Sequence, residues 1–263
     1  MENSRRFRRG ASILPSVFTT GNLFAGFWSI IRTWEGRFGD AALLVGVAVV
    51  LDILDGRIAR LTGTQSEFGA QLDSLADAVS FGVAPAILAF AWALSALPRV
   101  GWPAAFLFAA CGVLRLARFN VQRHAVDARY FVGLPIPAAA AQLAAVVFAL
   151  PEPPGSRLHG VLTLVLVIVL SFLMVSTYRY PSFKGIDLRR RRSYITVVGI
   201  ALLFLLVASH PELSLLGVTS LYTVSGPAAH AVGLIRRRGA PPVAAPATAF
   251  PSPDVGRDRV GGR

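Results

Sequence analysis

The stretch LDILDGRIARLTGTQSEFGAQLDSLAD, residues 51–77, places four aspartates along otherwise apolar segments. These are Asp52, Asp55, Asp73 and Asp77. A carboxylate held in or beside hydrocarbon is costly unless it is paired, protonated or bound to a cation. Acids kept in such a place therefore indicate chemistry or ion binding, and the rest of the sequence must distinguish between these uses.

The composition is that of a membrane protein. Of the 263 residues, 54% are hydrophobic and only 15% are charged, and the mean hydropathy is +0.58, far more apolar than a typical soluble domain. The net charge of +12 is compatible with nucleic acid or with anionic lipid as a partner, so the position of the charges must decide. The single cysteine, Cys111, excludes an internal disulfide.

Eight apolar segments each approach the roughly 20 residues that a membrane-spanning helix needs. They cover residues 13–33, 40–61, 73–96, 102–119, 131–150, 159–178, 193–209 and 212–235. The pattern predicts an all-α fold, a polytopic bundle of about eight transmembrane helices.

The basic residues sort onto one side of this predicted topology. All of the 26 Lys and Arg residues except Arg32, Arg37, Arg99 and Arg157 fall on the side that also carries both termini. By the positive-inside bias that side is cytoplasmic. The basic runs 189–192 and 236–238 are thus interpreted as topology signals and anchors for anionic lipid, and no nucleic-acid partner is expected.

The four aspartates form two pairs, spaced three and four residues apart, so each pair projects from one face of its own helix. The polar linker TGTQSEF, residues 62–68, favours a short reversal that brings the two helices together, antiparallel, at the cytoplasmic end. Four carboxylates there would repel one another unless cations neutralised them. With no His or Cys at ligand spacing, the oxygen ligands favour magnesium, manganese or calcium over zinc. Two such ions would form a clamp for displacement at a phosphoryl group.

Small residues lie beside the acids. Gly56, Ala59 and Gly69 leave space for a bulky ligand, and Arg60 offers a bidentate fork to a phosphate. Asn22, polar within an apolar segment, is expected either to face such a ligand or to hydrogen-bond a neighbouring helix.

The complete spacing, from Asp52 and Asp55 through Gly56, Ala59, Arg60, Gly69 and Asp73 to Asp77, resembles the signature of the CDP-alcohol phosphatidyltransferase family, with every position filled. Residues 14–30 (LPSVFTTGNLFAGFWSI), 73–86 (DSLADAVSFGVAPA), 114–120 (LRLARFN) and 131–140 (FVGLPIPAAA) are similar to the family's integral-membrane members that use L-serine as acceptor.

The resemblance implies transfer of the phosphatidyl group of CDP-diacylglycerol to the L-serine hydroxyl, with release of CMP. It implies two divalent cations, Mg²⁺ or Mn²⁺, with Asp52, Asp55 and Asp73 as principal ligands. Asp77 would touch a metal and act as the general base, while Asp52, Gly56, Ala59, Arg60 and Gly69 would receive the CDP moiety. A homodimer is also implied.

The acceptor's carboxylate needs its own site. Arg115 and Arg118, three apart on one helical face, are candidates together with Asn120, although positive-inside placement explains the arginines equally well. Two alternatives stay open. In the first, the chemistry is the same but the acceptor alcohol would be glycerol 3-phosphate, inositol phosphate or choline instead of serine. In the second, the acids belong to a cation transporter, which would be expected to spread them over several helices at the bilayer midplane.

The chain is accordingly divided into four parts. Residues 1–12 are a basic cytoplasmic N-terminus, 13–190 a catalytic membrane core of about six helices, 191–238 further transmembrane helices, and 239–263 a disordered tail rich in Pro, Ala and Gly. The expected location is the cytoplasmic (inner) membrane, with the active site and both termini facing the cytoplasm.

Overall fold

A computed structural model shows a mostly helical protein. It describes residues 2–63, 66–122, 130–181, 198–199, 202, 205 and 209–238, and within these the side chains of 2–15, 59, 60, 62, 122, 130, 131, 179, 181 and 232–238 lie outside the description. The described helices are α1 (Glu2–Trp34), α2 (Phe38–Thr62), α3 (Glu67–Asp77), the π-helical η1 (Ala78–Val83), α4 (Ala84–Trp92), the short 3-10 turn η2 (Leu94–Ala96), α5 (Gly101–Gln122), α6 (Ile136–Ala149), α7 (Arg157–Val175) and α9 (Pro211–Arg238). Two short strands, β1 (Tyr130–Val132) and β2 (Arg179–Pro181), complete the described elements.

Local signals in the sequence set the ends of the first helices. Gly36, with φ +74°, makes the tight turn between α1 and α2, and Gly63, with φ +62°, ends α2 in the left-handed conformation that favours glycine. Ser66 then begins α3, because its side-chain oxygen accepts a hydrogen bond from the Gly69 backbone N–H at 3.0 Å. The reversal between α2 and α3 is therefore short, as the polar linker predicts.

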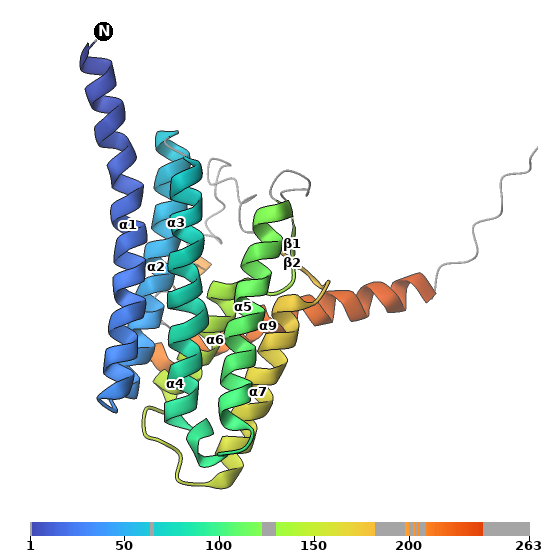
Figure 1. The fold of residues 1–263 in the computed structure, drawn as a ribbon. Coiled ribbons are helices and arrows are strands. Elements are labelled where there is room, and N and C mark those ends of the chain that lie inside the picture. The colour runs from blue at the N-terminus through green and yellow to red at the C-terminus, as the bar shows by residue number, and fades with distance from the viewer. Residues whose placement is uncertain are drawn as a thin grey trace, which may run out of the picture.

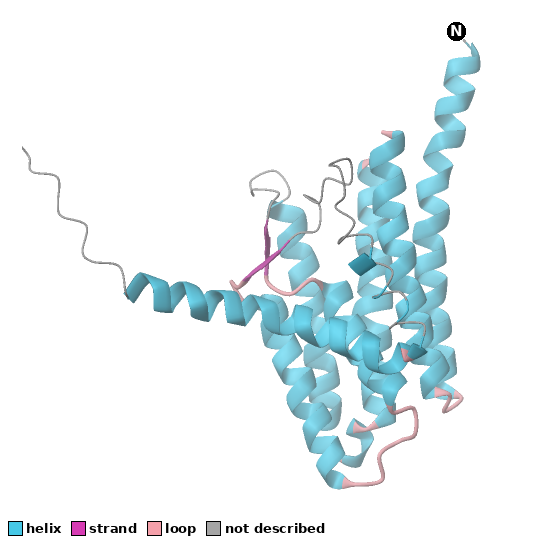
Figure 2. Cartoon of the chain, turned by 180° about the vertical axis from the view of Figure 1, so that it is seen from behind, coloured by secondary structure: helices cyan, strands magenta, loops and turns pink. Residues whose placement is uncertain are grey.

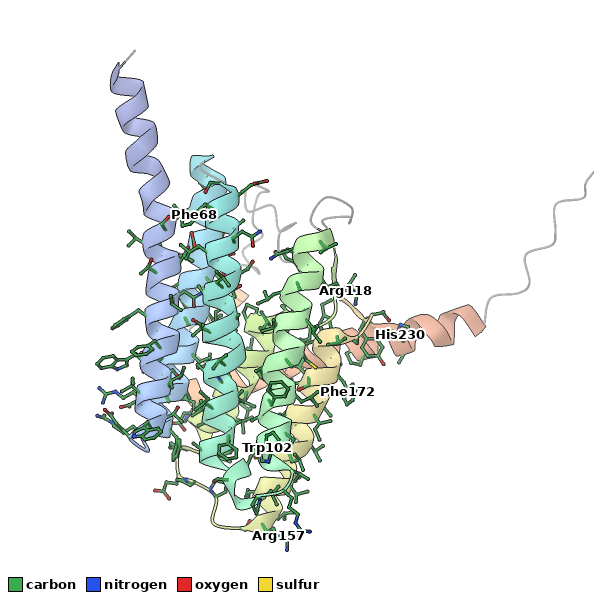
Figure 3. All side chains as sticks on the ribbon, in the orientation of Figure 1. Phe68, Trp102, Arg118, Arg157, Phe172 and His230 are labelled. Carbon is green, nitrogen blue, oxygen red and sulfur yellow. The ribbon has the colours of Figure 1, made fainter. Side chains whose placement is uncertain are left out.

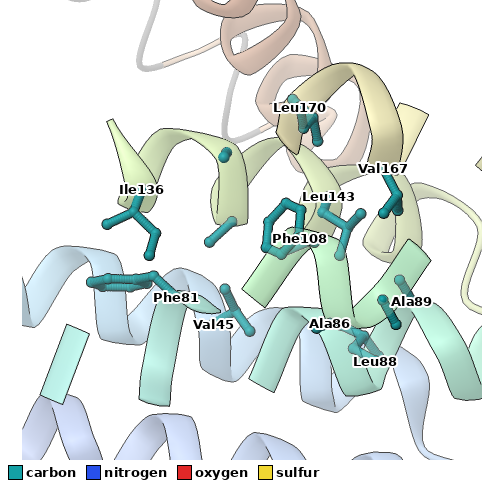
Figure 4. Packing of buried hydrophobic residues seen from close by; sticks show 14 of the residues in the cluster. Val45, Phe81, Ala86, Leu88, Ala89, Phe108, Ile136, Leu143, Val167 and Leu170 are labelled. Carbon is teal, nitrogen blue, oxygen red and sulfur yellow. The ribbon is translucent and has the colours of Figure 1, made fainter. Parts of the chain in front are cut away.

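The helices α1, α2 and the α3–α4 pair lie side by side, and α5 and α7 pack together on the other side of the bundle (Figure 1). Their shared core is built from small and branched side chains that let the helices approach closely. Figure 4 shows Phe81 of η1 close to Ile136 of α6, and Phe108 of α5 beside Leu143 of α6. Because the core joins η1 to α5 and α6, the segment that follows Asp77 is rigidly held.

Three stretches are long and apolar enough to cross a membrane: Glu67–Trp92, Gly101–Val121 and Arg157–Val175. The chain is a membrane protein, but the prediction of eight spans is not confirmed within the described residues. The predicted segment 73–96 begins earlier, at Glu67, since Ser66 caps it, and runs through the π-helical η1 to Trp92. The predicted segment 193–209 lies mostly outside the described residues.

The prediction of a helix over 131–150 is wrong at its start. Residues Tyr130–Val132 form β1, which pairs antiparallel with β2, with Phe131 opposite Tyr180. Gly133 follows with φ +79°, and a Cβ there would collide with the Met174 carbonyl oxygen. The helix α6 begins only at Ile136, after Pro135, because the positive φ of the glycine and the proline interrupt the helix at that point.

The final described helix, α9, crosses the bundle instead of running parallel to its neighbours (Figures 1 and 2). It contacts α6 and β2. The segment 212–235 was expected to span the membrane, but α9 is not among the three stretches that qualify by length and hydropathy. The serines and threonines in its sequence, together with Glu212 and His230, lower its hydropathy.

Candidate active site

Three of the four aspartates form one group. Asp52 on α2, Asp73 on α3 and Asp77 at the end of α3 each offer a carboxylate oxygen, and these oxygens all lie within 4.8 Å of one another. Asp77 is buried, with 8% of its surface exposed, and the other two are half-buried. The short reversal returns the chain toward α2, and α1 packs against both α2 and α3, so the group is assembled from residues on two successive helices.

A contact from α1 orients the Asp77 carboxylate. The Asn22 amide donates from Nδ2 to Asp77 Oδ1 at 3.1 Å. Asn22 is held in turn, because the Ser80 hydroxyl donates to its backbone carbonyl at 2.9 Å. Gly26, one turn along α1, permits this approach, since a Cβ there would collide with Ser80. Of the two expectations for Asn22, the structure shows a hydrogen bond to a neighbouring helix, and the partner is an acid of the group.

Asp55 does not join the group. It is buried, and its Oδ2 accepts a hydrogen bond from the Thr19 hydroxyl of α1. The expected convergence of all four carboxylates is therefore limited to three in this structure. The reason is that α1 packs along α2 and presents Thr19 to Asp55. Thr19 was not singled out by the sequence, although it stands in the stretch FTTGN, three residues before Asn22.

A buried arginine faces the group from α5. Arg115 has 8% of its surface exposed and lies within electrostatic range of Asp77 and of Tyr222 on α9. Its Nε is a buried donor without a hydrogen-bond partner among the described residues, and Asn22 Oδ1 is a buried acceptor in the same condition. Buried polar atoms in proteins are nearly always satisfied, so two unsatisfied ones beside Asp77 suggest a place for a polar ligand.

Arg118 and Asn120, the other candidates for an acceptor site, engage other partners. Arg118 is half-buried, and its Nη1 donates to the Val175 carbonyl of α7 at 3.5 Å. Figure 3 shows it on the side of the bundle nearest α9. Asn120 Nδ2 donates to the Ser74 hydroxyl at 3.0 Å, which ties α5 to α3 between Asp73 and Asp77. Of the three candidates, Arg115 is the one for which the structure gives an electrostatic contact with Asp77.

The residues expected to receive the nucleotide lie along α2 and α3. Gly56 is half-buried on α2, one residue after Asp55, and Gly69 is half-buried in the first turn of α3. Ala59 and Arg60 belong to the last turns of α2, and their side chains lie outside the described residues.

The donor set fits a hard divalent cation. Carboxylate oxygens alone are the ligands that magnesium, manganese and calcium prefer. Three acids this close, one of them buried, also carry a strong mutual repulsion that a cation would relieve. The group can therefore hold a metal ion beside a buried arginine and a pair of unsatisfied polar atoms.

Comparison with known proteins agrees with the signature. The model of the family described as CDP-alcohol phosphatidyltransferase matches residues 12–176. A curated relative from Helicobacter pylori, named CDP-diacylglycerol–serine O-phosphatidyltransferase, is 38% identical over 195 residues, which cover 73% of this chain and 81% of the relative. Relatives with the same name from Bacillus subtilis (35% over 171 residues, 65% of this chain and 91% of the relative) and Mycobacterium leprae (46% over 147 residues, 53% and 49%) are also similar.

Proposed function

Because the chain belongs to the CDP-alcohol phosphatidyltransferase family, we propose that it transfers the phosphatidyl group of CDP-diacylglycerol to the hydroxyl of L-serine and releases CMP. The similar curated relatives carry the name of that enzyme. The structural observation that carries the proposal is the group of Asp52, Asp73 and Asp77 with Arg115 buried beside it. Carboxylates gathered on two adjacent helices also count against the transporter alternative, which expects acids dispersed over several helices.

Asp52, Asp73 and Asp77 would hold a divalent cation, Mg²⁺ or Mn²⁺. When bound, the cation supplies positive charge that offsets the charge of the pyrophosphate and of the departing CMP. The proposal of a second cation, with Asp55 among its ligands, is supported by the sequence signature alone, because the Asp55 carboxylate accepts a hydrogen bond from Thr19.

Asp77 is proposed as the general base. The serine hydroxyl oxygen attacks the phosphorus of the phosphatidyl group, the bond from this phosphorus to the CMP oxygen breaks, and the hydroxyl proton passes to the Asp77 carboxylate. A positioned carboxylate of this kind contributes about 10²- to 10⁴-fold to the rate. Asn22 restricts the rotation of that carboxylate by donating to Oδ1. The proton acceptor is thus held in place before the substrate arrives.

Arg115 and Asn22 supply a cationic donor and a neutral acceptor for the two charged groups of an amino-acid substrate. Among the described residues neither Arg115 Nε nor Asn22 Oδ1 has a hydrogen-bond partner, so Nε suits the carboxylate of serine and Oδ1 suits its ammonium group. Glycerol 3-phosphate and inositol phosphate lack the ammonium group, and choline lacks the carboxylate. The pair of opposite polarity therefore favours serine among the acceptors considered.

The remaining assignments extend the proposal. Gly56, Ala59, Arg60 and Gly69 would receive the CDP moiety beside Asp52, with the acyl chains in the bilayer. Residues 13–190 would form the catalytic core, in the cytoplasmic membrane, with the site and both termini facing the cytoplasm, and two copies would form a homodimer. The nucleotide site, the core and the orientation are supported by the signature and by the positive-inside pattern, and the homodimer rests on the family resemblance alone.

The test is CMP release by the purified protein in mixed micelles that contain CDP-diacylglycerol and Mn²⁺. Serine, glycerol 3-phosphate, inositol phosphate and choline are offered in separate reactions. Serine-dependent release that is lost in Asp77→Asn and kept in Asp40→Asn, a surface acid outside the group, is the expected result. Release with another alcohol alone would overturn the serine assignment, and release with none would overturn the reaction.

A further inference from the structure

A groove of about 720 Å³ lies where the end of α7 meets α9. Its apolar part is formed by α7, through Val169, Phe172, Leu173 and Val175. All of these except Leu173 are exposed. Because α7 is itself long and apolar enough to cross a membrane, this exposed face is suited to contact with hydrocarbon chains. None of the described residues that line the groove belongs to the carboxylate group.

The other end of the groove is polar. It is lined by Ser176, Thr177 and Tyr178, which lead into β2, and by His230 of α9. The strand β2 pairs with β1 in a two-stranded ribbon that holds this segment in place, and the His230 ring packs against Tyr178, with ring centroids 5.1 Å apart. No acid is among the described residues that line the groove. This end therefore offers hydroxyl and imidazole donors without a competing negative charge.

An arginine of α5 lies beside the polar end. Arg118 Nη1 donates to the carbonyl of Val175, which lines the groove, and Figure 3 shows Arg118, Phe172 and His230 on the same side of the bundle. A guanidinium has five donors, and this bond uses one of them. Within the part of the chain that the structure describes, no carboxylate forms an ion pair with Arg118. Its charge can therefore be met by an anion from another molecule.

We infer that the groove binds a membrane phospholipid with an anionic headgroup, at a site outside the carboxylate group. A phospholipid has the polarity of the groove, because its acyl chains match the exposed face of α7 and its phosphate matches the donors and Arg118 at one end. The sequence after β2 adds Lys184 and Arg189–Arg192, a basic run of the kind that attracts anionic lipid. Such binding needs neither substrate nor metal, so it is independent of the proposed reaction.

The test is a titration of the purified protein in detergent micelles with phosphatidylglycerol or with phosphatidylcholine of the same acyl chains, read as the melting temperature without metal or substrate. Phosphatidylcholine balances its phosphate with its own ammonium group. We expect phosphatidylglycerol to reach half-maximal stabilisation at about a tenfold lower mole fraction, the size typical of one hydrogen bond between charged groups. Equal stabilisation of the wild type by the two lipids would overturn the inference.

Arg118→Gln should remove this preference, because both lipids then meet a neutral side chain. The matched control is Arg157→Gln, at the exposed start of the same helix α7 (Figure 3), and it should keep the preference. An equal loss in the two variants would show a general effect of charge and no site. If Arg118→Gln does not fold, Arg118→Lys replaces it and should keep a reduced preference, since lysine retains the charge without the planar fork. A wild-type preference in Arg118→Lys would contradict the assigned contact.

The apolar half has its own test. Phe172→Ala should weaken the binding of both lipids to the same degree, whereas Phe106→Ala, which removes an exposed ring of α5 outside the groove, should weaken neither. Unchanged lipid binding in Phe172→Ala would exclude the acyl chains from this groove. Inorganic phosphate should not stabilise the protein, and stabilisation by phosphate alone would assign the polar end to a free anion instead of a lipid. None of these readouts uses CMP release, so a failure of the proposed reaction remains distinguishable.

Discussion

The two ends of the bundle use acidic residues in opposite ways. At the α1–α2 turn, Glu35 pairs with Arg32 at 2.7 Å and Asp40 pairs with Arg37 at 2.6 Å, and both acidic side chains are 44% exposed. Toward the other end, marked by Phe68 in Figure 3, Asp77 is 8% exposed and gathered with two further acids.

The difference lies in where the partners come from. At the turn each acid meets an arginine three residues away, so the pair forms within a single turn of chain and contributes little to stability. The buried group requires α2 and α3 to be brought together by α1, which packs against both helices, with α1 and α5 supplying Asn22 and Arg115. The three carboxylates held close together repel one another, and binding of a cation would relieve this repulsion.

The comparison predicts its largest effect at Asp77. Asp77→Asn should reduce kcat for CMP release by about 10²-fold or more, because the proton acceptor is lost. CDP-diacylglycerol binding, measured as a thermal shift in the presence of Mn²⁺, should remain detectable. Binding lost as completely as turnover would instead indicate that Asp77 serves mainly to hold the donor. Asp40→Asn, at the opposite end, is the matched control and should leave both quantities unchanged.

A second effect concerns the metal. Asp52→Asn and Asp73→Asn should each raise the Mn²⁺ concentration needed for half-maximal thermal stabilisation by about 10- to 100-fold, since each removes one ligand of the proposed site. The readout is the melting temperature of the protein during a Mn²⁺ titration, without substrate. Titration curves that coincide with those of the wild type would exclude these two residues as ligands.

A third effect tests the ribbon beside the site. Gly133→Ala should lower the free energy of unfolding by about 2 kcal/mol, because φ is positive there and the new methyl group would meet the Met174 carbonyl. The control is Gly46→Ala in α2, where a Cβ meets nothing within 4 Å and helix propensity favours alanine. Equal melting temperatures for the two variants would show that the ribbon tolerates movement at this glycine.

The smallest effect is expected at the turn. Arg37→Ala should change the unfolding free energy by less than about 1 kcal/mol, because its ion pair with Asp40 is solvent-exposed and screened by salt. The measurement is the melting temperature at low and high ionic strength, together with CMP release, which should not change. A large loss of activity would show that the α1–α2 turn is coupled to the carboxylate group, and would contradict the view that its exposed ion pairs have no role in catalysis.

Much of the helical framework was predictable from the sequence because long apolar runs have few alternatives in a membrane. The predicted segments 40–61, 102–119 and 159–178 lie within three residues of α2, α5 and α7 at each end. The group of Asp52, Asp73 and Asp77 was also accessible, since it follows from helical spacing and one short reversal.

The remaining features depend on contacts between distant parts of the chain. No local pattern pairs residues 130–132 with 179–181, so the start of α6 was predicted too early. The separation of Asp55 from the group depends on Thr19 of α1, 36 residues earlier. The direction of α9 depends on the fit of Tyr180 against Gly226. In each case the deciding partner is set by packing and not by periodicity.

The π-helical turn Ala78–Val83 begins immediately after Asp77. A π turn accommodates one extra residue, and one residue corresponds to about 100° of rotation around a helix axis. The helical phase of α4 is thereby offset from that of α3. The face of α3 that carries Asp73 and Asp77 can point toward the carboxylate group. The face of α4 that carries Leu88 and Ala89, both fully buried, can point into the apolar core. The continuous segment α3–η1–α4 can therefore direct its carboxylates and its buried apolar side chains toward different sides of the helix axis.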